Sequence, residues 1–367
     1  MSERLPAAAD CDAMTDLEPG AAFVEHGAAP REGLVHLHLG ESPFGTSTAA
    51  GEAAAESVAD LRLYPDPARF ELVEALAAHW DLAPDQVAVA NGSEELVLLC
   101  ALSVGDLGRH GLTTAGTFPG YRAALTLARR GVREVPLAET RPDVEAFVAE
   151  LPGAGVGFLC NPHNPSGSVH TAEELDTLVE AAARSEVPLA FDEAYMDFAA
   201  PGTPSTRDYL DHGAPVLALR TLSKAYGLAA LRVGYAIGAA ETIAALRRAQ
   251  GVIPFSVNRV AQAAAVRALQ DREFVEGVRR ANAERRSWLV EELRRRGRDV
   301  LPSEGNFVAV PVGDSAQAAE RLEREHDILT RDTGAFGFPG HLRVTIGEQH
   351  ELEALLDALD DVDPLSS

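Results

Sequence analysis

The chain of 367 residues contains one lysine, Lys224, although it has 32 basic side chains in all. The other basic residues are therefore arginines, which stay protonated and cannot act as amine nucleophiles. Only Lys224 offers a side-chain amine that can lose its proton and form a Schiff base with a carbonyl compound. Thr221, Ser223 and Arg232 lie close to it in sequence and suit a carbonyl compound that also carries a phosphate. A surface lysine without function is the alternative interpretation.

Other features that the sequence lacks narrow the class of protein. It has three widely spaced cysteines and no C-x-x-C pair, which predicts reduced thiols, no metal cluster and a cytoplasmic location. No apolar run is long enough to span a membrane, and the first thirty residues carry acids where a signal peptide would be basic and then apolar. The net charge of −24 argues against nucleic acid or an anionic membrane surface as a partner.

The order of the expected elements indicates an α/β fold. Residues 1–33 lack apolar periodicity and predict an N-terminal arm. Strands alternate with helices from about residue 86 to 219, which predicts a large domain at residues 34–250 with a mostly parallel sheet covered on both faces. The start of this domain is also compatible with packing in the smaller one. Residues 251–367 predict a smaller α+β domain that opens with one long helical region, at about 258–297.

Two candidate motifs follow expected strands, where ligands bind in parallel sheets. Asn91-Gly92-Ser93-Glu94 lies between a strand and a helix, so its free N–H groups can hold an anion, with a simple N-cap as the alternative. It is not the G-x-G-x-x-G motif, and the sequence gives no support for dinucleotide binding. Asn161-Pro162-His163-Asn164-Pro165-Ser166-Gly167 predicts a rigid turn that presents the Asn164 amide, and a purely structural turn is equally compatible.

Acidic and aromatic side chains follow two further strands. Phe191-Asp192-Glu193-Ala194-Tyr195 ends a buried strand with two carboxylates and a phenol. A carboxylate there is suited to binding magnesium, capping a helix, pairing with a buried cation or keeping a heteroaromatic nitrogen protonated. Phe118 and Tyr121 follow the other strand, and core packing is the favoured interpretation of these two aromatic residues.

These motifs, in this order and with these gaps, resemble the fold-type-I pyridoxal-phosphate aminotransferases, and most closely the histidinol-phosphate aminotransferase branch. The matching runs are Asn-Gly-Ser-Glu, Asn-Pro-His-Asn-Pro-Ser-Gly, Asp-Glu-Ala-Tyr, Thr-Leu-Ser-Lys-Ala-Tyr-Gly-Leu and Leu-Arg-Val-Gly. The resemblance extends from about residue 34 to the C-terminus. It implies a large domain with a mostly parallel seven-stranded sheet and a smaller α+β C-terminal domain. It also implies transfer of an amino group between an amino acid donor and an oxo acceptor, with pyridoxal 5'-phosphate as the cofactor.

The resemblance implies a role for each motif. Lys224 is expected to form the Schiff base with the cofactor and to move the proton during transfer. Asp192 is expected to pair with the ring nitrogen, and Tyr195 and Asn164 to bond the ring oxygen. The remaining expected cofactor contacts are ring stacking by Phe118 and phosphate binding by Gly92, Ser93, Glu94, Thr221, Ser223 and Arg232. Tyr64, in the corner Tyr64-Pro65-Asp66-Pro67, is expected to reach the partner subunit's phosphate, which implies a homodimer with shared sites.

The resemblance also implies which residues bind the substrate. Arg343 matches the arginine that binds an α-carboxylate, and Arg331 matches the one that meets a second anionic group, a phosphate in histidinol-phosphate enzymes. Glu41 and Asn164 lie on the substrate side. The loop that the branch writes as Asn-Glu-Asn-Pro is Gly40-Glu41-Ser42-Pro43 here, and residues 1–33 lack the tyrosine that the branch usually carries. A different substrate, from specialised metabolism, is therefore an alternative.

Two other functions are compatible with the same motifs. A decarboxylase of a phosphorylated amino acid would use the same lysine and aspartate. A non-catalytic regulator with this fold is disfavoured because every position with a chemical role is filled. No metal is expected in any of these cases.

Overall fold

The computed structural model describes residues 33–364. The predicted N-terminal arm therefore lies outside the described residues, except for Gly33. The described residues from Leu34 to Pro364 belong to one compact unit. Among the described residues, no helix is both long enough and apolar enough to cross a membrane.

A seven-stranded sheet lies at the centre of the large α/β part, in the order β2-β10-β9-β8-β7-β3-β4. Its strands are β2 (Val87–Ala90), β3 (Gly111–Thr114), β4 (Val132–Val135), β7 (Val156–Cys160), β8 (Leu189–Asp192), β9 (Val216–Thr221) and β10 (Gly234–Gly238). The strands from β9 to β4 are parallel, and β10 is antiparallel to both of its neighbours. The predicted mostly parallel, seven-stranded sheet is confirmed.

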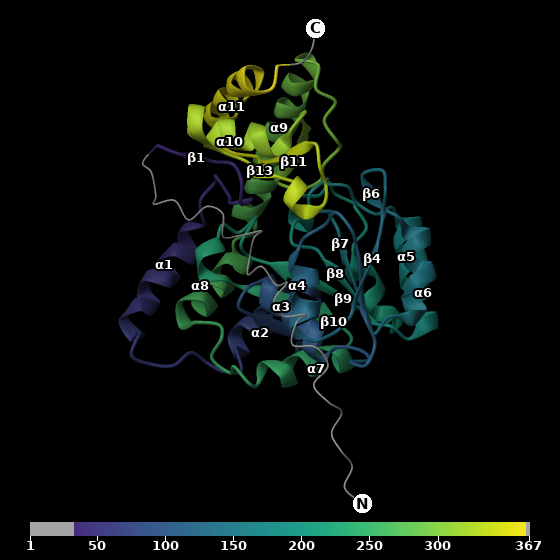
Figure 1. The fold of residues 1–367 in the computed structure, drawn as a ribbon. Helices are drawn as coiled ribbons and strands as arrows, with labels where there is room; N and C mark the ends of the chain where they lie inside the picture. Colours follow the sequence, from purple (N-terminus) through teal and green to yellow (C-terminus); the bar gives the residue numbers. More distant parts are fainter. Residues whose placement is uncertain (1–32, 365–367) are drawn as a thin grey trace, which may run out of the picture. The chain divides into compact units, whose positions relative to one another are not determined.

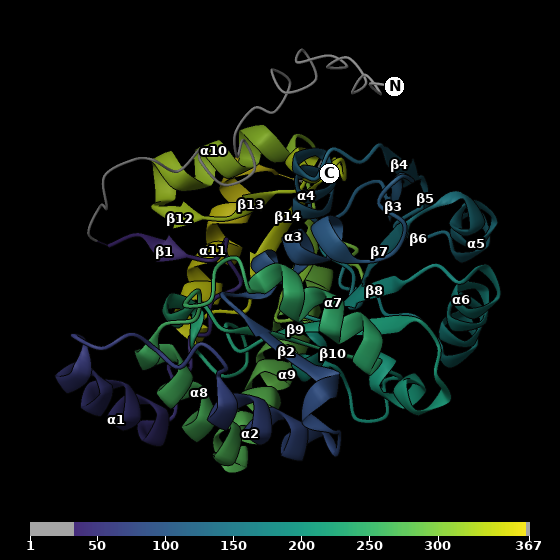
Figure 2. The same ribbon diagram turned by 90° about the horizontal axis from the view of Figure 1, so that it is seen from below.

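Helices cover both faces of this sheet, as Figure 1 and Figure 2 show. One face carries α3 (Ser93–Ser103), α4 (Gly120–Leu127) and α7 (Ala240–Gln250). The other face carries α2 (Phe70–Trp80), α5 (Val144–Glu150), α6 (Ala172–Ser185) and α8 (Arg259–Gln270), and α1 (Thr48–Ser57) packs on α8. A sheet buried on both faces explains why its strands are short runs of mainly apolar or small residues without polar alternation.

The C-terminal region forms a third core around an antiparallel sheet with the order β11-β14-β13. Its elements are α9 (Arg272–Arg295), β11 (Phe307–Pro311), α10 (Ser315–His326), β12 (Ile328–Leu329), β13 (Arg331–Asp332), β14 (His341–Thr345) and α11 (Gln349–Val362). Strand β1 (Val35–His36) pairs in parallel with β12, so the first described residues pack with the last part of the chain. A short hairpin, β5 (Leu137–Ala138) and β6 (Arg141–Pro142), lies apart.

Single-turn and short 3-10 helices occupy several connections. They span Val58–Asp60, Pro84–Gln86, Leu151–Gly153, Met196–Phe198, Thr206–His212, Ala229–Leu231 and Gly334–Phe336.

Some element boundaries differ from the expected ones because a side chain ends or starts a helix. Asp271 leaves the helical conformation and its carboxylate accepts from the Phe274 N–H, so the expected helix at 258–297 is two helices, α8 and α9. Ser47 caps α1, which begins at Thr48. Strand β10 lies beyond residue 219, where the expected alternation of strands and helices ends, and it was not predicted.

Candidate active site

The carboxyl ends of β7, β8 and β9 bring the predicted motifs to one edge of the large sheet. Cys160 at the end of β7 is in register with Asp192 at the end of β8, and Asp192 is in register with Leu219 of β9. The turn that contains Asn164 follows β7, and Lys224 follows β9. Parallel strands end at the same edge, so residues from three separate motifs converge there.

Lys224 is half-buried, and its Nζ donates to the carbonyl oxygen of Leu39 at 2.7 Å. The amine lies 5.6 Å from the centre of the Tyr195 ring. Burial, with the positive charge of Arg343 as the next cause, lowers the pKa of Lys224 to about 8, and the charge of Glu41 opposes this effect. A larger share of this amine is therefore neutral at physiological pH than in an ordinary lysine, and the neutral amine is the nucleophile.

Asp192 is buried, and each of its carboxylate oxygens accepts one hydrogen bond. The Tyr121 hydroxyl donates to Oδ2 at 2.8 Å, and the Ala194 N–H donates to Oδ1 at 3.1 Å. Burial raises the pKa of Asp192 to about 6, the two hydrogen bonds lower it, and the charges of Glu193 and Glu94 raise it. At pH 7 the group is mainly ionised and can pair with a protonated ring nitrogen.

Arg343 of β14 reaches from the C-terminal region to this edge of the large sheet. Its Nη1 donates to Asn164 Oδ1 and its Nη2 donates to the His38 carbonyl oxygen, both at 2.7 Å. The buried Tyr195 ring meets Phe307 edge-on, with the ring centres 4.9 Å apart. Burial raises the pKa of Tyr195 to about 12, against the opposing charge of Arg343. The phenol is therefore protonated at neutral pH and can donate a hydrogen bond.

An anion-binding arrangement lies at the start of α3. Gly92 precedes this helix with φ +85°, and a Cβ at this position would lie 2.6 Å from Arg232 Nη2. Arg232 donates to the Glu94 carboxylate at 2.8 Å and lies 3.5 Å from the Ser223 hydroxyl. Thr221 Oγ1 accepts from the Ser223 N–H at 3.1 Å. A helix N-terminus beside hydroxyls and a guanidinium suits a phosphate.

Two further predicted cofactor contacts border the same region. Ser93 is the first residue of α3 and is half-buried. Phe118 is half-buried, and its ring meets the Tyr121 ring edge-on at 5.3 Å. Tyr121 is a buried core residue, as the sequence predicts, and it also donates a hydrogen bond to Asp192, which no local pattern encodes.

Tyr64 lies at the surface of the single chain. Its side chain is 77% exposed, and its ring stacks on Phe255 with the centres 4.6 Å apart. Its carbonyl oxygen accepts from Arg259 Nη2. Its contacts within one chain are thus with Phe255 and Arg259, whereas the resemblance implies that it acts on the partner subunit.

The two predicted substrate arginines lie side by side in the C-terminal sheet. Arg331 of β13 and Arg343 of β14 are register partners, and both are buried. The guanidinium of Arg331 lies 5.3 Å and that of Arg343 lies 5.6 Å from the centre of the Phe336 ring. Glu41 is exposed and acts on the Lys224 amine through its charge. Two guanidiniums on adjoining strands favour an anionic ligand.

The backbone around Gly40 connects the amine to the C-terminal sheet. The Gly40 N–H donates to Thr345 Oγ1 at 2.9 Å, and Asn306 Nδ2 donates to the Gly40 carbonyl oxygen at 3.0 Å. Gly40 has φ +66°, and a Cβ on it would lie 3.1 Å from Lys224 Nζ. Gly40 occupies the position of an asparagine in the histidinol-phosphate aminotransferase branch, and it leaves room beside the Lys224 amine. Asn306 and Thr345 were missed as site residues, because contacts between distant segments have no local signal.

Glu193 has a structural role that differs from that of its neighbour Asp192. Adjacent strand residues point to opposite faces, and the buried Glu193 carboxylate pairs with Arg220 of β9 at 2.6 Å. Arg220 also lies 3.3 Å from Asp197 and stacks over the Trp80 ring at 4.4 Å. This ion pair joins β8 to β9 directly beside the candidate site.

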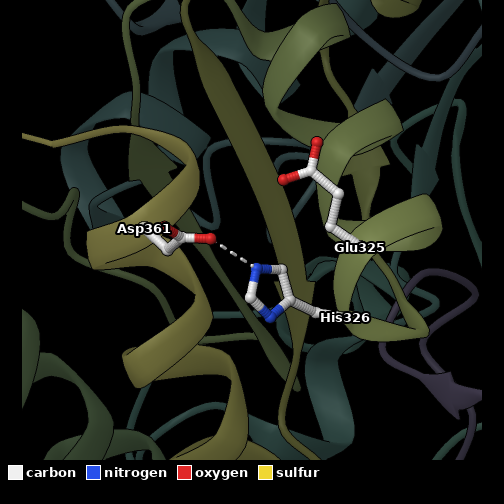
Figure 3. Close-up of side chains that lie close together, drawn as sticks. All are labelled: Glu325, His326 and Asp361. Carbon is white, nitrogen blue, oxygen red and sulfur yellow. Dashed lines mark hydrogen bonds and ion pairs between the residues drawn. The ribbon is translucent and has the colours of Figure 1, made fainter.

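Glu325, His326 and Asp361 form a separate cluster of side chains of the kind that bind metal ions. Its ligand atoms lie within 4.8 Å of one another, and His326 Nε2 is 3.0 Å from Asp361 Oδ2 (Figure 3). Arg321 donates to both oxygens of Glu325, at 3.1 and 2.8 Å, and lies 3.9 Å from Asp361. A guanidinium already compensates these carboxylates, so we assign no ion to the cluster, and the expected absence of a metal stays a prediction.

Known proteins resemble the chain over almost its whole length. The family model for aminotransferases of class I and II matches residues 32–359. A histidinol-phosphate aminotransferase of Brevibacillus brevis is 34% identical over 332 residues, which are 90% of each chain. A histidinol-phosphate aminotransferase of Symbiobacterium thermophilum is 36% identical over 327 residues, which are 89% of this chain and 90% of that relative. The solved structure of the Sinorhizobium meliloti histidinol-phosphate aminotransferase in complex with pyridoxal 5'-phosphate is 28% identical, with a TM-score of 0.82 and 97% coverage of both chains.

The residues at the sheet edge fit pyridoxal 5'-phosphate. They offer the Lys224 amine, whose pKa is lowered, and the buried Asp192 carboxylate. They also place Gly92 beside the Arg232 guanidinium, with which a Cβ at residue 92 would collide. These relatives are aminotransferases and give no support to the decarboxylase alternative. The chain therefore belongs to the class I and II aminotransferases and is an enzyme that uses pyridoxal 5'-phosphate as its cofactor.

Proposed function

We propose that the enzyme transfers the amino group of histidinol phosphate to a 2-oxo acid. The observation that carries this proposal is the buried register pair of Arg331 and Arg343, because two guanidiniums provide separate places for a phosphate and a carboxylate. The names of the relatives, at 34 and 36% identity, support the same substrate. Arg331 would take the phosphate of the donor, and Arg343 would take the α-carboxylate of the acid.

The proposal assigns the cofactor's ring to four side chains. Pyridoxal 5'-phosphate supplies an aldehyde for the Lys224 amine and a protonated ring that withdraws electrons from the reacting carbon. Asp192 would hold the ring nitrogen in its protonated form. Asn164 Oδ1 accepts from Arg343, which leaves its amide N–H groups to donate to the ring oxygen, together with the Tyr195 hydroxyl. Phe118 would stack on the ring.

The phosphate of the cofactor would lie at the N-terminus of α3. The proposed ligands are backbone N–H groups of Gly92, Ser93 and Glu94, the hydroxyls of Thr221 and Ser223, and the Arg232 guanidinium. Glu94 would contribute its backbone rather than its carboxylate, because a carboxylate repels a phosphate. Its ion pair with Arg232 would then be exchanged for one between Arg232 and the phosphate.

Lys224 would also move the proton during transfer. A pKa of about 8 suits this task, since a group that titrates near the working pH both accepts and returns a proton readily. The charge of Glu41 favours the protonated form of this amine, and Glu41 would also contact the bound substrate.

The proposal includes a cytoplasmic homodimer in which Tyr64 reaches the partner's cofactor phosphate. Large apolar side chains that are exposed gather in two segments, at Leu61, Leu63, Tyr64, Val252, Ile253 and Phe255. Residues 61–65 and 258–260 line one cavity of about 560 Å³. Exposed apolar surface of this kind is typical of an interface between subunits. The division into a large domain at residues 34–250 and a small domain at residues 251–367 is part of the same proposal, and the packing of α8 in the core of the large sheet favours a break nearer Asp271.

A donor screen tests the substrate. Histidinol phosphate and histidinol are supplied as amino donors with a series of 2-oxo acids, and the oxo product is measured. We expect saturable transfer from histidinol phosphate and a much higher KM for histidinol. An Arg331→Met variant should raise the KM for histidinol phosphate at least tenfold and leave that for histidinol unchanged. Equal use of both donors by the native enzyme would contradict the proposed substrate.

A further inference from the structure

We propose that Tyr121 is a positioning residue, which keeps Asp192 ionised and fixes the direction in which its carboxylate faces the cofactor. This inference depends on the proposed role of Asp192 at the ring nitrogen. It rests on the hydrogen bond between the two side chains, on the packing that holds the tyrosine and on the charges around the carboxylate.

The hydrogen bond has a defined direction. Tyr121 Oη lies 2.8 Å from Asp192 Oδ2. An ionised carboxylate can only accept, so the phenol donates. The Ala194 N–H donates to the other oxygen at 3.1 Å. With one protein donor on each oxygen the carboxylate cannot rotate freely, and each oxygen still has a lone pair for a third partner.

Packing holds the phenol in place. Tyr121 is fully buried on α4, and its ring stacks on Phe158 of β7 with centres 5.5 Å apart and planes 11° from parallel. Phe118 meets the same ring edge-on at 5.3 Å. The two contacts restrict the plane and the position of the ring, and so hold the hydroxyl toward Asp192.

The surroundings of Asp192 otherwise oppose its charge. The titratable groups that act on Asp192 are Glu193, which follows it in the chain and acts through its charge, Glu94 on α3, Cys160 on β7, and the phenols of Tyr195 and Tyr121. None of these groups is a cation. Burial raises the pKa of Asp192 to about 6, and the Tyr121 hydrogen bond is the first of the causes that lower it. Without this donor a larger share of Asp192 would be protonated at neutral pH.

The test replaces Tyr121 by phenylalanine, which keeps the ring packing and removes only the hydroxyl. The matched control is Tyr235→Phe, because Tyr235 is an equally buried phenol whose oxygen accepts from Trp80 rather than contacting Asp192. The pKa of Asp192 is followed in the cofactor-free full-length chain by ¹³C NMR of labelled aspartate, with the signal assigned by its loss in Asp192→Asn. We expect the proton affinity of Asp192 to rise about tenfold in Tyr121→Phe and to stay unchanged in Tyr235→Phe.

The loaded enzyme gives a second measurement. In Tyr121→Phe the kcat should fall at pH 6–7 and recover as the pH rises, with little change in KM, because a protonated Asp192 cannot pair with a protonated ring nitrogen. An unchanged Asp192 pKa in Tyr121→Phe would overturn the inference and leave the proposed function intact. Full kcat in Asp192→Asn would instead contradict the proposed role of Asp192, so the two failures can be told apart.

Discussion

At the scale of single residues, the chemistry of the site depends on what surrounds each group. Lys224 and Asp192 both lose solvent, and the loss acts on them in opposite directions: it lowers the pKa of the amine and raises that of the carboxylate. Neighbouring charges then adjust each value. Arg343 lowers the pKa of the Lys224 amine and Glu41 raises it. A measured pKa of Lys224 therefore reports how these two charges lie around the amine.

The pH dependence of cofactor attachment should report the Lys224 pKa. Only the neutral amine attacks the aldehyde, so the rate of reconstitution of the cofactor-free chain should rise with pH, with a midpoint near pH 8, and level off about one pH unit above it. Glu41→Gln removes a charge that raises this pKa and should move the midpoint to lower pH. Arg343→Met removes a charge that lowers it and should move the midpoint to higher pH. A rate that still rises steeply above pH 9 in the native chain would contradict the lowered pKa.

The cradle at Gly92 gives a second prediction at this scale. Gly92→Ala introduces a methyl group 2.6 Å from Arg232 Nη2 and requires an alanine at φ +85°. We expect the affinity for pyridoxal 5'-phosphate, measured by fluorescence titration, to fall at least tenfold, because both the guanidinium and the helix N-terminus must shift.

Gly277→Ala is the matched control for this change. Gly277 lies inside α9, and a Cβ there meets no atom within 4 Å. Its cofactor affinity should be unchanged, and its stability should rise by about 0.5–1 kcal/mol, since alanine is the better helix former. Equal affinities of the two variants would show that Gly92 is not part of the phosphate site.

At the scale of elements, the sequence predicts the strands, helices and turns that local residue patterns encode. The predicted alternation of strands and helices is observed, and the motifs that follow strands lie at the expected sheet edge. Strand β10 was missed because Gly234–Gly238 has a glycine at each end and pairs on one side with β2, which is far away in sequence. The separate roles of Asp192 and Glu193, and the bonds of Gly40 to Asn306 and Thr345, depend on tertiary contacts that no local pattern encodes.

The ion pair between β8 and β9 should contribute strongly to stability. Glu193→Gln leaves the buried Arg220 guanidinium without its full counter-charge, and we expect a loss of about 3–5 kcal/mol in the free energy of unfolding. Glu320→Gln breaks the exposed Arg324 pair on α10 and should cost less than about 1 kcal/mol. Urea unfolding of both variants checks the comparison, and similar losses in the two would contradict it.

At the scale of the whole molecule, the site draws on two of the sheets in the described part of the chain. Lys224 and Asp192 come from the large sheet, whereas Arg343 and Arg331 come from the C-terminal sheet. Any movement between the two sheets would therefore change the distance between the amine and the guanidiniums that are proposed to hold the substrate.

Mixing two variants tests the proposed dimer with shared sites. Lys224→Ala removes the amine, and Tyr64→Ala removes the proposed contact with the partner's phosphate. Each variant alone should have low activity. After joint unfolding and refolding with cofactor, half of the dimers should be mixed, and one of the two sites in each has both native residues, so about one quarter of the sites should be active. No gain over the separate samples, together with a monomeric mass in sedimentation, would contradict the shared site.

The single lysine has a practical consequence for following this enzyme in complex samples. Apart from the chain's N-terminal amine, Lys224 is the one amine available to acylating reagents, and it is half-buried beside Leu39. A lysine-directed label would therefore report the state of one atom. A lysine-specific protease would cut the unfolded chain only after Lys224, into two fragments, and a cofactor fixed to that amine by borohydride should block the cut. Fragment patterns on a gel would then measure how much of the protein carries its cofactor.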